Sequence, residues 1–256
     1  MIYVTGDIHG NHSIQKLSSK KFKSSLFSRD DIIIICGDFG LIWSAKESKE
    51  EKYWLDWLND KGGTVCFVDG NHENFCRLRE YPVSKWSGGY VRHIREKVLH
   101  LMRGQIFEIG GNKFFTMGGA SSHDIKGGIL EPDDPELKQK MKKLDKMGVS
   151  YRINHLEWWE EELPSEEELE EGLENLKKAK WKVDYIISHC APLSVQLQLV
   201  GEARGRDRLV EYFEEIQEKC SFKKWYFGHY HMDRSIKEKY VALYNQIVTV
   251  ESNHDI

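Results

Sequence analysis

Apolar and polar segments alternate through the first third of the chain. Continuous apolar runs at residues 2–5, 31–36 and 64–68 are separated by segments with helical spacing, of which 46–61 is the longest. Unbroken β-branched runs of this length are typical of parallel strands that are buried on both faces. The alternation therefore predicts a βαβαβ unit, whose right-handed crossovers bring three strand ends to one edge of a sheet.

The middle of the chain has a less regular pattern. Short alternating segments at 90–94, 98–101, 105–109 and 113–117 predict an antiparallel meander and the beginning of a second sheet. Residues 125–152 are the most polar part, with prolines ahead of a charged helix predicted at 136–147. We interpret this segment as a polar helical insertion, which is either a mobile lid or a solvated excursion.

The last third returns to the opening pattern. Helices are predicted at 165–181 and 206–219, strands at 183–187 and 224–227, and two or three closing strands at 234–250 that complete a sheet. The chain has no internal repeat and no linker-like tract. We therefore predict one domain over residues 1–256.

Composition narrows the class of protein. A net charge of −4 provides no basic surface for nucleic acid, although bound metal ions would still allow a nucleotide substrate. Five cysteines, an odd number without paired spacing, predict a reduced, cytoplasmic protein. No apolar stretch reaches membrane-spanning length, so no membrane partner is expected.

Five of the predicted strands end in side chains that bind metals. These side chains are Asp7, His9, Asp38, Asn71, His189, His229 and His231. Imidazole, carboxylate and amide oxygen together suit Mn²⁺, Fe, Zn²⁺ or Mg²⁺ better than a thiolate-rich structural zinc. Seven ligands are too many for one tetrahedral ion but fit two ions that share Asp38. Two ions about 3.5–4 Å apart are the clamp used for phosphoester hydrolysis.

The ordered set of motifs resembles that of the calcineurin-like metallophosphoesterase superfamily. The motifs are Asp7-x-His9, Gly37-Asp38, Gly70-Asn71-His72-Glu73, Ser188-His189 and Gly228-His229-x-His231. The resemblance spans residues 6–231 and implies an α/β fold, a four-layer α/β/β/α sandwich of two mixed sheets flanked by helices. It also implies two divalent cations, Mn²⁺ first, with Fe, Zn²⁺ or Mg²⁺ as alternatives.

The same resemblance implies a role for each ligand. One cation is held by Asp7, His9, Asp38 and His231, and the other by Asp38, Asn71, His189 and His229. The implied enzyme is a dinuclear metal-dependent phosphoesterase, in which a metal-bridging hydroxide attacks the phosphorus of a phosphomonoester or phosphodiester. The implied catalytic residues are Asp38 and His72, with His72 supplying a proton or hydrogen bond to the leaving group.

Three positions depart from the protein-phosphatase branch of the superfamily. That branch has an Asp and an Arg where this chain has Leu41 and Ile42, and an Arg where it has Asp69. The departures remove arginines that bind phosphate and a carboxylate that orients His72. The Ser-His-x-x-Pro context of His189 instead resembles the broad bacterial phosphoesterase group, with a small or nucleotide-like substrate.

Another residue must then contact the substrate. We consider Arg152 as a phosphate or substrate contact and Asp124 and His123 as rim residues, with a surface salt bridge as the equal alternative. Arg204, Arg206 and Arg208, which follow His189, are rival candidates.

Two other functions are consistent with this fold. A metal-dependent nuclease is one, although the even charge and the lack of a basic stripe argue against it. A non-catalytic interaction scaffold, like the retromer subunit of this superfamily, is the other. Such a scaffold should have lost ligands, whereas all seven are present in this sequence.

Overall fold

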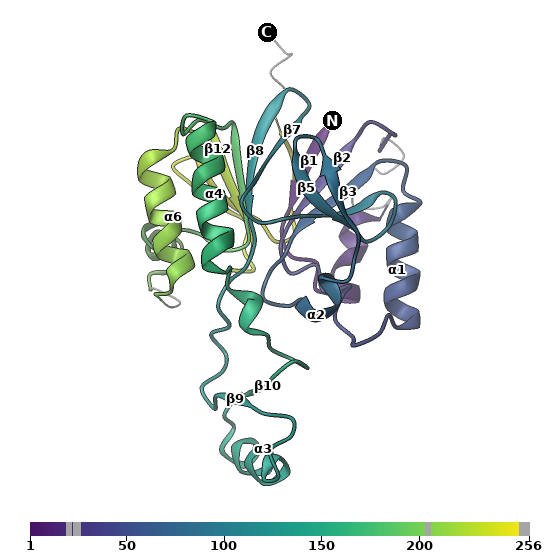
Figure 1. Ribbon diagram of the computed structural model, residues 1–256, viewed down its shortest axis with the longest axis vertical. Helices are drawn as coiled ribbons and strands as arrows, with labels where there is room; N and C mark the ends of the chain where they lie inside the picture. Colours follow the sequence, from purple (N-terminus) through teal and green to yellow (C-terminus); the bar gives the residue numbers. More distant parts are fainter. Residues whose placement is uncertain (19–21, 23–26, 203–205, 251–256) are drawn as a thin grey trace.

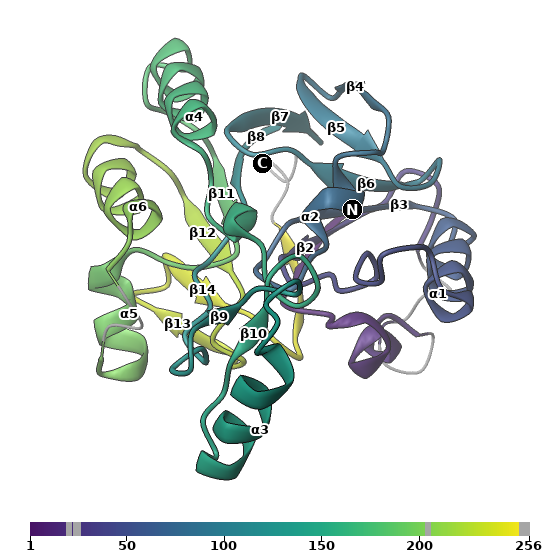
Figure 2. The same ribbon diagram turned by 60° about the horizontal axis from the view of Figure 1, so that its bottom comes forward.

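Two mixed β-sheets packed face to face, with helices on both outer sides, form a four-layer α/β/β/α sandwich (Figures 1 and 2). The computed structural model describes residues 1–18, 22, 27–202 and 206–250. The first sheet has the order β15 (Ile247–Val250), β1 (Ile2–Thr5), β2 (Ile32–Cys36), β3 (Thr64–Val68), β6 (Val98–Leu101), β5 (Gly89–His93), β4 (Val83–Trp86). The second has the order β13 (Arg234–Ile236), β14 (Tyr240–Ala242), β12 (Lys224–Phe227), β11 (Tyr185–Ser188), β8 (Asn112–Met117), β7 (Gln105–Ile109).

The outer layers are helical. The first sheet is covered by the 3₁₀ turns η1 (Gly10–His12) and η2 (Ile14–Leu17), by α1 (Lys49–Asn59) and by the short α2 (Phe75–Leu78). The second sheet is covered by α4 (Glu166–Lys178), α5 (Leu193–Val200) and α6 (Arg208–Lys219). Among the described residues, no helix is both long and apolar enough to cross a bilayer.

Three apolar cores separate the four layers, and strand β2 shows how one strand serves two of them. Ile33 and Ile35 pack toward Leu55 and Leu58 of α1, whereas Ile34 and Cys36 pack between the sheets. All six side chains are buried. A strand that faces apolar neighbours on both sides needs an unbroken apolar sequence, which confirms the prediction made from this run.

The parallel pairing places the strand ends as predicted. Strands β1, β2 and β3 are parallel neighbours in the first sheet, and β11 and β12 are parallel neighbours in the second. The βαβαβ prediction is confirmed in topology. In the described part of the connection after β1, however, residues 10–17 form the 3₁₀ turns η1 and η2 and not an α-helix.

Other expectations were wrong in detail. The predicted meander is divided, because β5 and β6 extend the first sheet whereas β7 and β8 belong to the second. The closing strands are also divided: β13 and β14 lie in the second sheet, and β15 pairs antiparallel with β1 in the first. Strand β4 and helix α5 were not predicted. Short strands of similar composition carry no local signal that tells which sheet they will join.

A polar segment projects from the sandwich (Figure 1). We call residues 125–153 the arm; it consists of β9 (Ile129–Leu130), α3 (Leu137–Met147) and β10 (Arg152–Ile153). Strands β9 and β10 form a separate two-stranded parallel sheet, and no side chain of α3 is buried. The helix predicted at 136–147 is thus confirmed to within one residue.

Candidate metal centre

Loops from both sheets meet at one edge of the sandwich. Asp7, Asp38 and Asn71 follow β1, β2 and β3, while His189 and His229 follow β11 and β12. The parallel strands of a sheet end at the same edge, so residues distant in sequence become neighbours there. Together with His9 and His231, these are the seven ligands predicted from the sequence, and the structure brings all of them together.

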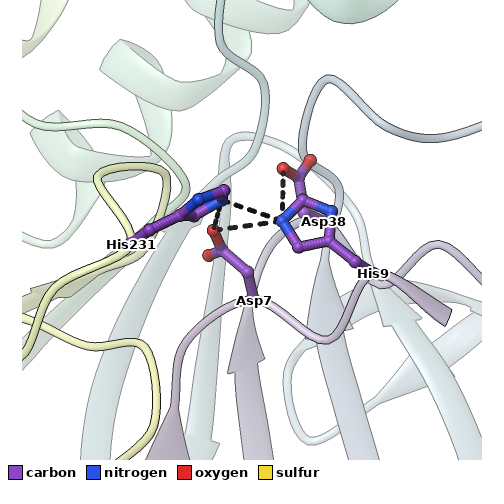
Figure 3. A group of neighbouring side chains, drawn as sticks. All are labelled: Asp7, His9, Asp38 and His231. Atoms are coloured by element: carbon purple, nitrogen blue, oxygen red, sulfur yellow. Dashed lines mark hydrogen bonds and ion pairs between the residues drawn. The ribbon is translucent and has the colours of Figure 1, made fainter. Parts of the chain in front are cut away.

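The first group of donors consists of Asp7, His9, Asp38 and His231, whose ligand atoms lie within 4.8 Å of one another (Figure 3). The Nε2 atom of His231 is 3.2 Å from Oδ2 of Asp7, and Nε2 of His9 is 3.6 Å from Oδ2 of Asp38. The two Nε2 atoms are 2.9 Å apart. Two carboxylates and two imidazoles that face one point suit a divalent cation.

A second group lies on the other side of Asp38. Nε2 of His189 is 3.3 Å from Oδ1 of Asp38 and 3.3 Å from Oδ1 of Asn71. Nδ1 of His229 is also 3.3 Å from this Nε2 atom. Asp38 therefore lies between the groups, with Oδ2 toward the first and Oδ1 toward the second. The other ring nitrogen of His189 is 2.9 Å from the carbonyl oxygen of Cys36, which orients the ring so that Nε2 faces the group.

The backbone at these positions is unusual. Four of the ligands have φ between 41° and 66°, namely His9, Asp38, His229 and His231. A left-handed conformation costs a non-glycine residue about 1–3 kcal/mol and persists only where the surroundings impose it. Here the backbone N–H of His229 donates to Asp7 and that of His72 donates to Asp38, at 3.0 and 2.9 Å. The motif that contains His229 thereby orients the carboxylate of Asp7, and the motif that contains His72 orients that of Asp38.

Two of the motif glycines are required by close packing. A Cβ atom on Gly70 would lie 2.0 Å from Oδ1 of Asp38, and one on Gly228 would lie 1.9 Å from Oδ1 of Asp7. Any side chain at either position would displace a carboxylate of the cluster. The Gly-Asn-His and Gly-His patterns therefore have a packing reason in addition to the turn that follows the strand.

A buried lysine supports the first loop. Nζ of Lys16 donates to the carbonyl oxygens of Gly6, Asp7 and Tyr244, at 2.9, 2.7 and 2.5 Å. Burial lowers the pKa of Lys16 to about 8, although Asp7 opposes the shift. The sequence analysis missed this residue because its acceptors are carbonyl groups, one of them 228 positions away.

The electrostatics of the cluster favour cations. Burial opposes ionisation of Asp7, yet hydrogen bonds from His231 and His9 hold its pKa well below the usual value. Burial also opposes ionisation of Asp38, but the neighbouring His189 holds that pKa low. Burial, together with the charge of His189, lowers the pKa of His229 to about 3, which leaves its ring neutral at pH 7. Both carboxylates are therefore ionised although they are buried. Burial opposes protonation of His9 as well, but Asp7 and Asp38 raise its pKa.

His189 supplies the principal counter-charge. Burial opposes its protonation, but Asp38 and Asp7 raise its pKa to about 9. A cation at Nε2 would replace this proton and would balance the carboxylates more completely. The residues present therefore fit two divalent cations: oxygen and imidazole donors converge in two groups, and the shared carboxylate lies between them.

His72 lies at the boundary between two cavities. A small cavity of about 170 Å³ is lined by ligands of both groups together with His72, His123 and Asp124. A larger one of about 640 Å³ is also lined by His72 and Asp124, and further by Trp43, Tyr244 and Arg152. The ring of His72 is 5.2 Å from that of His9. A side chain here can contact both a group bound between the donors and the part of the same molecule that extends into the larger cavity.

The predicted substrate contacts lie at the rim. Arg152 forms an ion pair with Asp124, and the exposed His123 has its ring 5.4 Å from that of His229. Of the rival arginines, Arg208 pairs with Glu166 and lines a different cavity, Arg206 pairs with Glu211, and Arg204 lies outside the described residues. Arg152 lines the larger cavity beside His72, and its ion pair with Asp124 is also the salt bridge of the alternative interpretation.

The three departures from the protein-phosphatase pattern have structural counterparts. Leu41 and Ile42 belong to the buried core between the first sheet and its helices. The carboxylate of Asp69 forms a buried ion pair with Arg103 at 2.6 Å, and its Oδ1 atom lies 2.9 Å from Nε2 of His100. These positions therefore contribute apolar packing and an internal ion pair, and no charged side chain toward the cluster.

The sequence comparison agrees with this geometry. The profile of the calcineurin-like phosphoesterase family matches residues 1–233. No curated protein sequence matches the chain. The matched range contains all five motifs, both groups of donors and the whole arm.

Proposed function

Because this chain belongs to the calcineurin-like phosphoesterase family, we propose that it is a dinuclear metal-dependent phosphoesterase that hydrolyses a small or nucleotide-like phosphomonoester or phosphodiester. The observation that carries the proposal is the convergence of seven donors from five loops, with Asp38 between the two groups. A scaffold that had lost its chemistry would have no reason to keep this costly arrangement of buried carboxylates and strained backbone.

Each cation has its own set of residues in this proposal. Asp7, His9 and His231 hold one, Asn71, His189 and His229 hold the other, and Asp38 contacts both. When bound, such a pair supplies Lewis acidity, which lowers the pKa of water and neutralises charge on phosphoryl oxygens. We expect Mn²⁺ in both positions, with Fe, Zn²⁺ or Mg²⁺ as alternatives, because hard and borderline cations match oxygen and imidazole donors.

His72 is the residue that we assign to the leaving group. It lines both the small cavity at the donors and the larger one beside it, where the departing alcohol would lie. Burial lowers the pKa of His72, although Asp38 opposes the shift, so the ring is neutral at pH 7. A neutral imidazole donates a hydrogen bond from its N–H, which stabilises the oxygen as the ester bond breaks.

The larger cavity supports a substrate of limited size. Its volume of about 640 Å³ lies in the range of small-molecule sites, and Trp43 and Tyr244 provide aromatic surface in its wall. Arg152 supplies a guanidinium group at its edge, held by Asp124, with His123 at the rim of the small cavity. We assign Arg152 to a phosphate oxygen of the substrate. Residues 1–256 would then act as one domain, with Arg152 as the contribution of the arm to the lining of this cavity.

We further propose that the protein acts in the reducing cytoplasm. All five cysteines are free, and four of them are buried: Cys36, Cys66, Cys190 and Cys220. Free thiols in the apolar cores are typical of proteins that fold under reducing conditions.

The test is hydrolysis of a chromogenic phosphomonoester, a diester and a single-stranded oligonucleotide by Mn²⁺-loaded protein. We expect turnover of at least one of the two small esters, and Asp38→Ala should lose metal and activity together, by more than about 10³-fold. Asp30→Ala, at an exposed aspartate, is the matched control. Unchanged activity of Asp38→Ala would refute the dinuclear scheme, cleavage of the oligonucleotide alone would favour the nuclease, and metal binding without any hydrolysis would favour the scaffold.

A further inference from the structure

The side-chain amide of Asn71 has two chemically different ends, and only one of them can bind a cation. Its Oδ1 atom lies 3.3 Å from Nε2 of His189, inside the second group of donors. Its Nδ2 atom lies 3.3 Å from Oγ of Ser122. A rotation of the amide by 180° would exchange these ends at little steric cost, because the oxygen and nitrogen atoms are almost equal in size.

The partner of Ser122 determines which end faces the cations. The backbone N–H of Ser122 donates to Oε1 of Glu162 at 2.8 Å, and its Oγ–H donates to Oε2 of the same carboxylate at 2.7 Å. Burial raises the pKa of Glu162 to about 7, although the hydrogen bonds from Ser122 oppose the shift, so at pH 8 the carboxylate is mostly ionised. An ionised carboxylate can only accept hydrogen bonds, so the single hydroxyl hydrogen of Ser122 is then used here. The lone pairs of Oγ remain, and they can accept the N–H of Asn71 but cannot donate to its oxygen.

Glu162 is itself held firmly. It ends the 3₁₀ turn η4 (Glu160–Glu162) and is 3% exposed. Its backbone carbonyl accepts the N–H of Ala120 at 3.1 Å, and its own N–H donates to the carbonyl of Trp159 at 3.0 Å. The loop that carries Ser122 and the turn that carries Glu162 are therefore joined through both backbone and side chains, on either side of the arm.

We infer that Ser122 and Glu162 are positioning residues, which fix the amide of Asn71 so that its oxygen, and not its nitrogen, faces the second cation. The inference rests on the proposed dinuclear centre. The chain of hydrogen bonds joins Glu162, Ser122 and Asn71, and the ionised carboxylate, which can only accept, sets its direction. Without it, the amide can present its N–H₂ group, whose hydrogens repel a cation.

The inference predicts an effect on one cation only. Partners that orient a metal ligand typically change metal affinity by about 10- to 100-fold when they are removed. Among the described residues, no hydrogen bond joins Ser122 or Glu162 to the first group, which consists of Asp7, His9, Asp38 and His231. Removal of the Ser122 hydroxyl should therefore weaken the second binding event and leave the first unchanged.

The experiment is a titration of cation-free protein with Mn²⁺ alone at pH 8, where Glu162 is mostly ionised, followed by calorimetry and by the electron paramagnetic resonance signal of a coupled manganese pair. Wild type should bind two ions and show the coupled signal. Ser122→Ala should bind the first ion normally and the second about 10- to 100-fold more weakly, and the coupled signal should disappear at equal loading. Ser122→Thr, which keeps the hydroxyl, should restore both.

The neighbouring serine provides the matched control. The hydroxyl of Ser121 pairs with Asp207 at the start of α6 and is directed away from Asn71, so Ser121→Ala should bind both ions as wild type does. Melting of the cation-free variants separates positioning from misfolding, because Ser122→Ala and Ser121→Ala should melt together. Normal affinity of Ser122→Ala for both ions, equal loss of both, or failure of Thr to restore them would overturn the positioning role. A wild type that binds one ion at most would instead refute the dinuclear centre itself.

Discussion

The sandwich and the arm use the same kind of amphipathic helix for different purposes. In α6, which covers the second sheet, Leu209, Phe213 and Ile216 are buried in the core. In α3, at the far end of the arm, the apolar stripe is only half-buried, and Leu144 faces Gly127 of the arm itself. An apolar stripe predicts a helix in both cases. Only in α6 does packing of that stripe against a sheet bury it and fix the position of the helix.

The sandwich and the arm therefore contribute different parts of the site. All seven donors follow strands of the sandwich, where packing on both faces can impose left-handed backbone and buried charge. The arm contributes at its base, where Arg152 pairs with Asp124 beside the larger cavity. Changes in the sandwich should therefore have large effects on chemistry and stability, and changes in the arm small effects on substrate binding alone.

Among variants that should keep both cations, the largest effect is expected at His72. His72→Ala should retain both cations, because the side chain is no ligand, and should slow turnover by about 10²- to 10⁴-fold through loss of the hydrogen bond to the leaving group. Steady-state kinetics and metal analysis of the same preparation measure the two quantities. His155→Ala, at an exposed imidazole just beyond the arm, should change neither. Loss of cations from His72→Ala would contradict the assignment.

A matched pair of lysines tests stability in the two regions. Lys16→Met removes three hydrogen bonds to buried carbonyl groups, and we expect the free energy of unfolding to fall by about 2–4 kcal/mol. Lys142→Met, on the exposed face of α3, should stay within about 0.5 kcal/mol of wild type. Urea unfolding of cation-free protein gives both values. An equal loss of unfolding free energy in the two variants would contradict the expected difference in stability between the sandwich and the arm.

The buried charge of the cluster predicts a pH dependence of metal binding. The aspartates Asp38 and Asp7 outweigh burial and raise the pKa of His189 to about 9 from 6.5, so the folded, cation-free protein holds a proton there at neutral pH. A cation must displace this proton, and its affinity should rise about tenfold per pH unit up to about pH 9. Calorimetry at pH 7.5 in buffers of different ionisation enthalpy should detect the released proton.

The same shift affects the stability of the cation-free protein. The folded pKa of His189 lies above its unfolded value, so the stability that it contributes is complete below pH 6.5 and is lost as the pH rises to about 9. Saturation with Mn²⁺ should abolish this decline. A metal affinity that does not change between pH 6.5 and 9 would contradict both expectations.

The smallest effect is expected from the arm. Arg152→Ala should raise KM about 3- to 10-fold with little change in kcat, because a guanidinium at the rim contributes a partly solvated contact. The KM of Arg152→Lys should lie between that of Arg152→Ala and that of wild type. Lys126→Ala, an exposed cation of the same arm, is the control. A drop in kcat as large as that of His72→Ala would place the arm within the catalytic machinery.

Much of the fold was predictable because strand β2 and its neighbours are apolar on both faces. The order of the motifs and the polar residues at the strand ends were sufficient to select the seven donors. The assignment of short strands to sheets was not predictable, since β4, β7 and β13 have no composition that distinguishes one sheet edge from another. Helix α5 was missed because its mostly apolar sequence has no polar face to mark a helical period.

The residues that support the site, Lys16, Ser122 and Glu162, could not be predicted from local sequence patterns. Lys16 contacts carbonyl groups, which every residue has, and Ser122 contacts Glu162, 40 positions later. Neither pairing leaves a periodic trace in the sequence.

The sequence by itself determined which side chains would end the buried strands, because burial on both faces restricts what a strand can contain and leaves the polar residues at its end. Only the tertiary structure decided which atom of each side chain faces its neighbours. Donor direction depends on hydrogen bonds between loops that are distant in the sequence, and these form only when both sheets have been packed together.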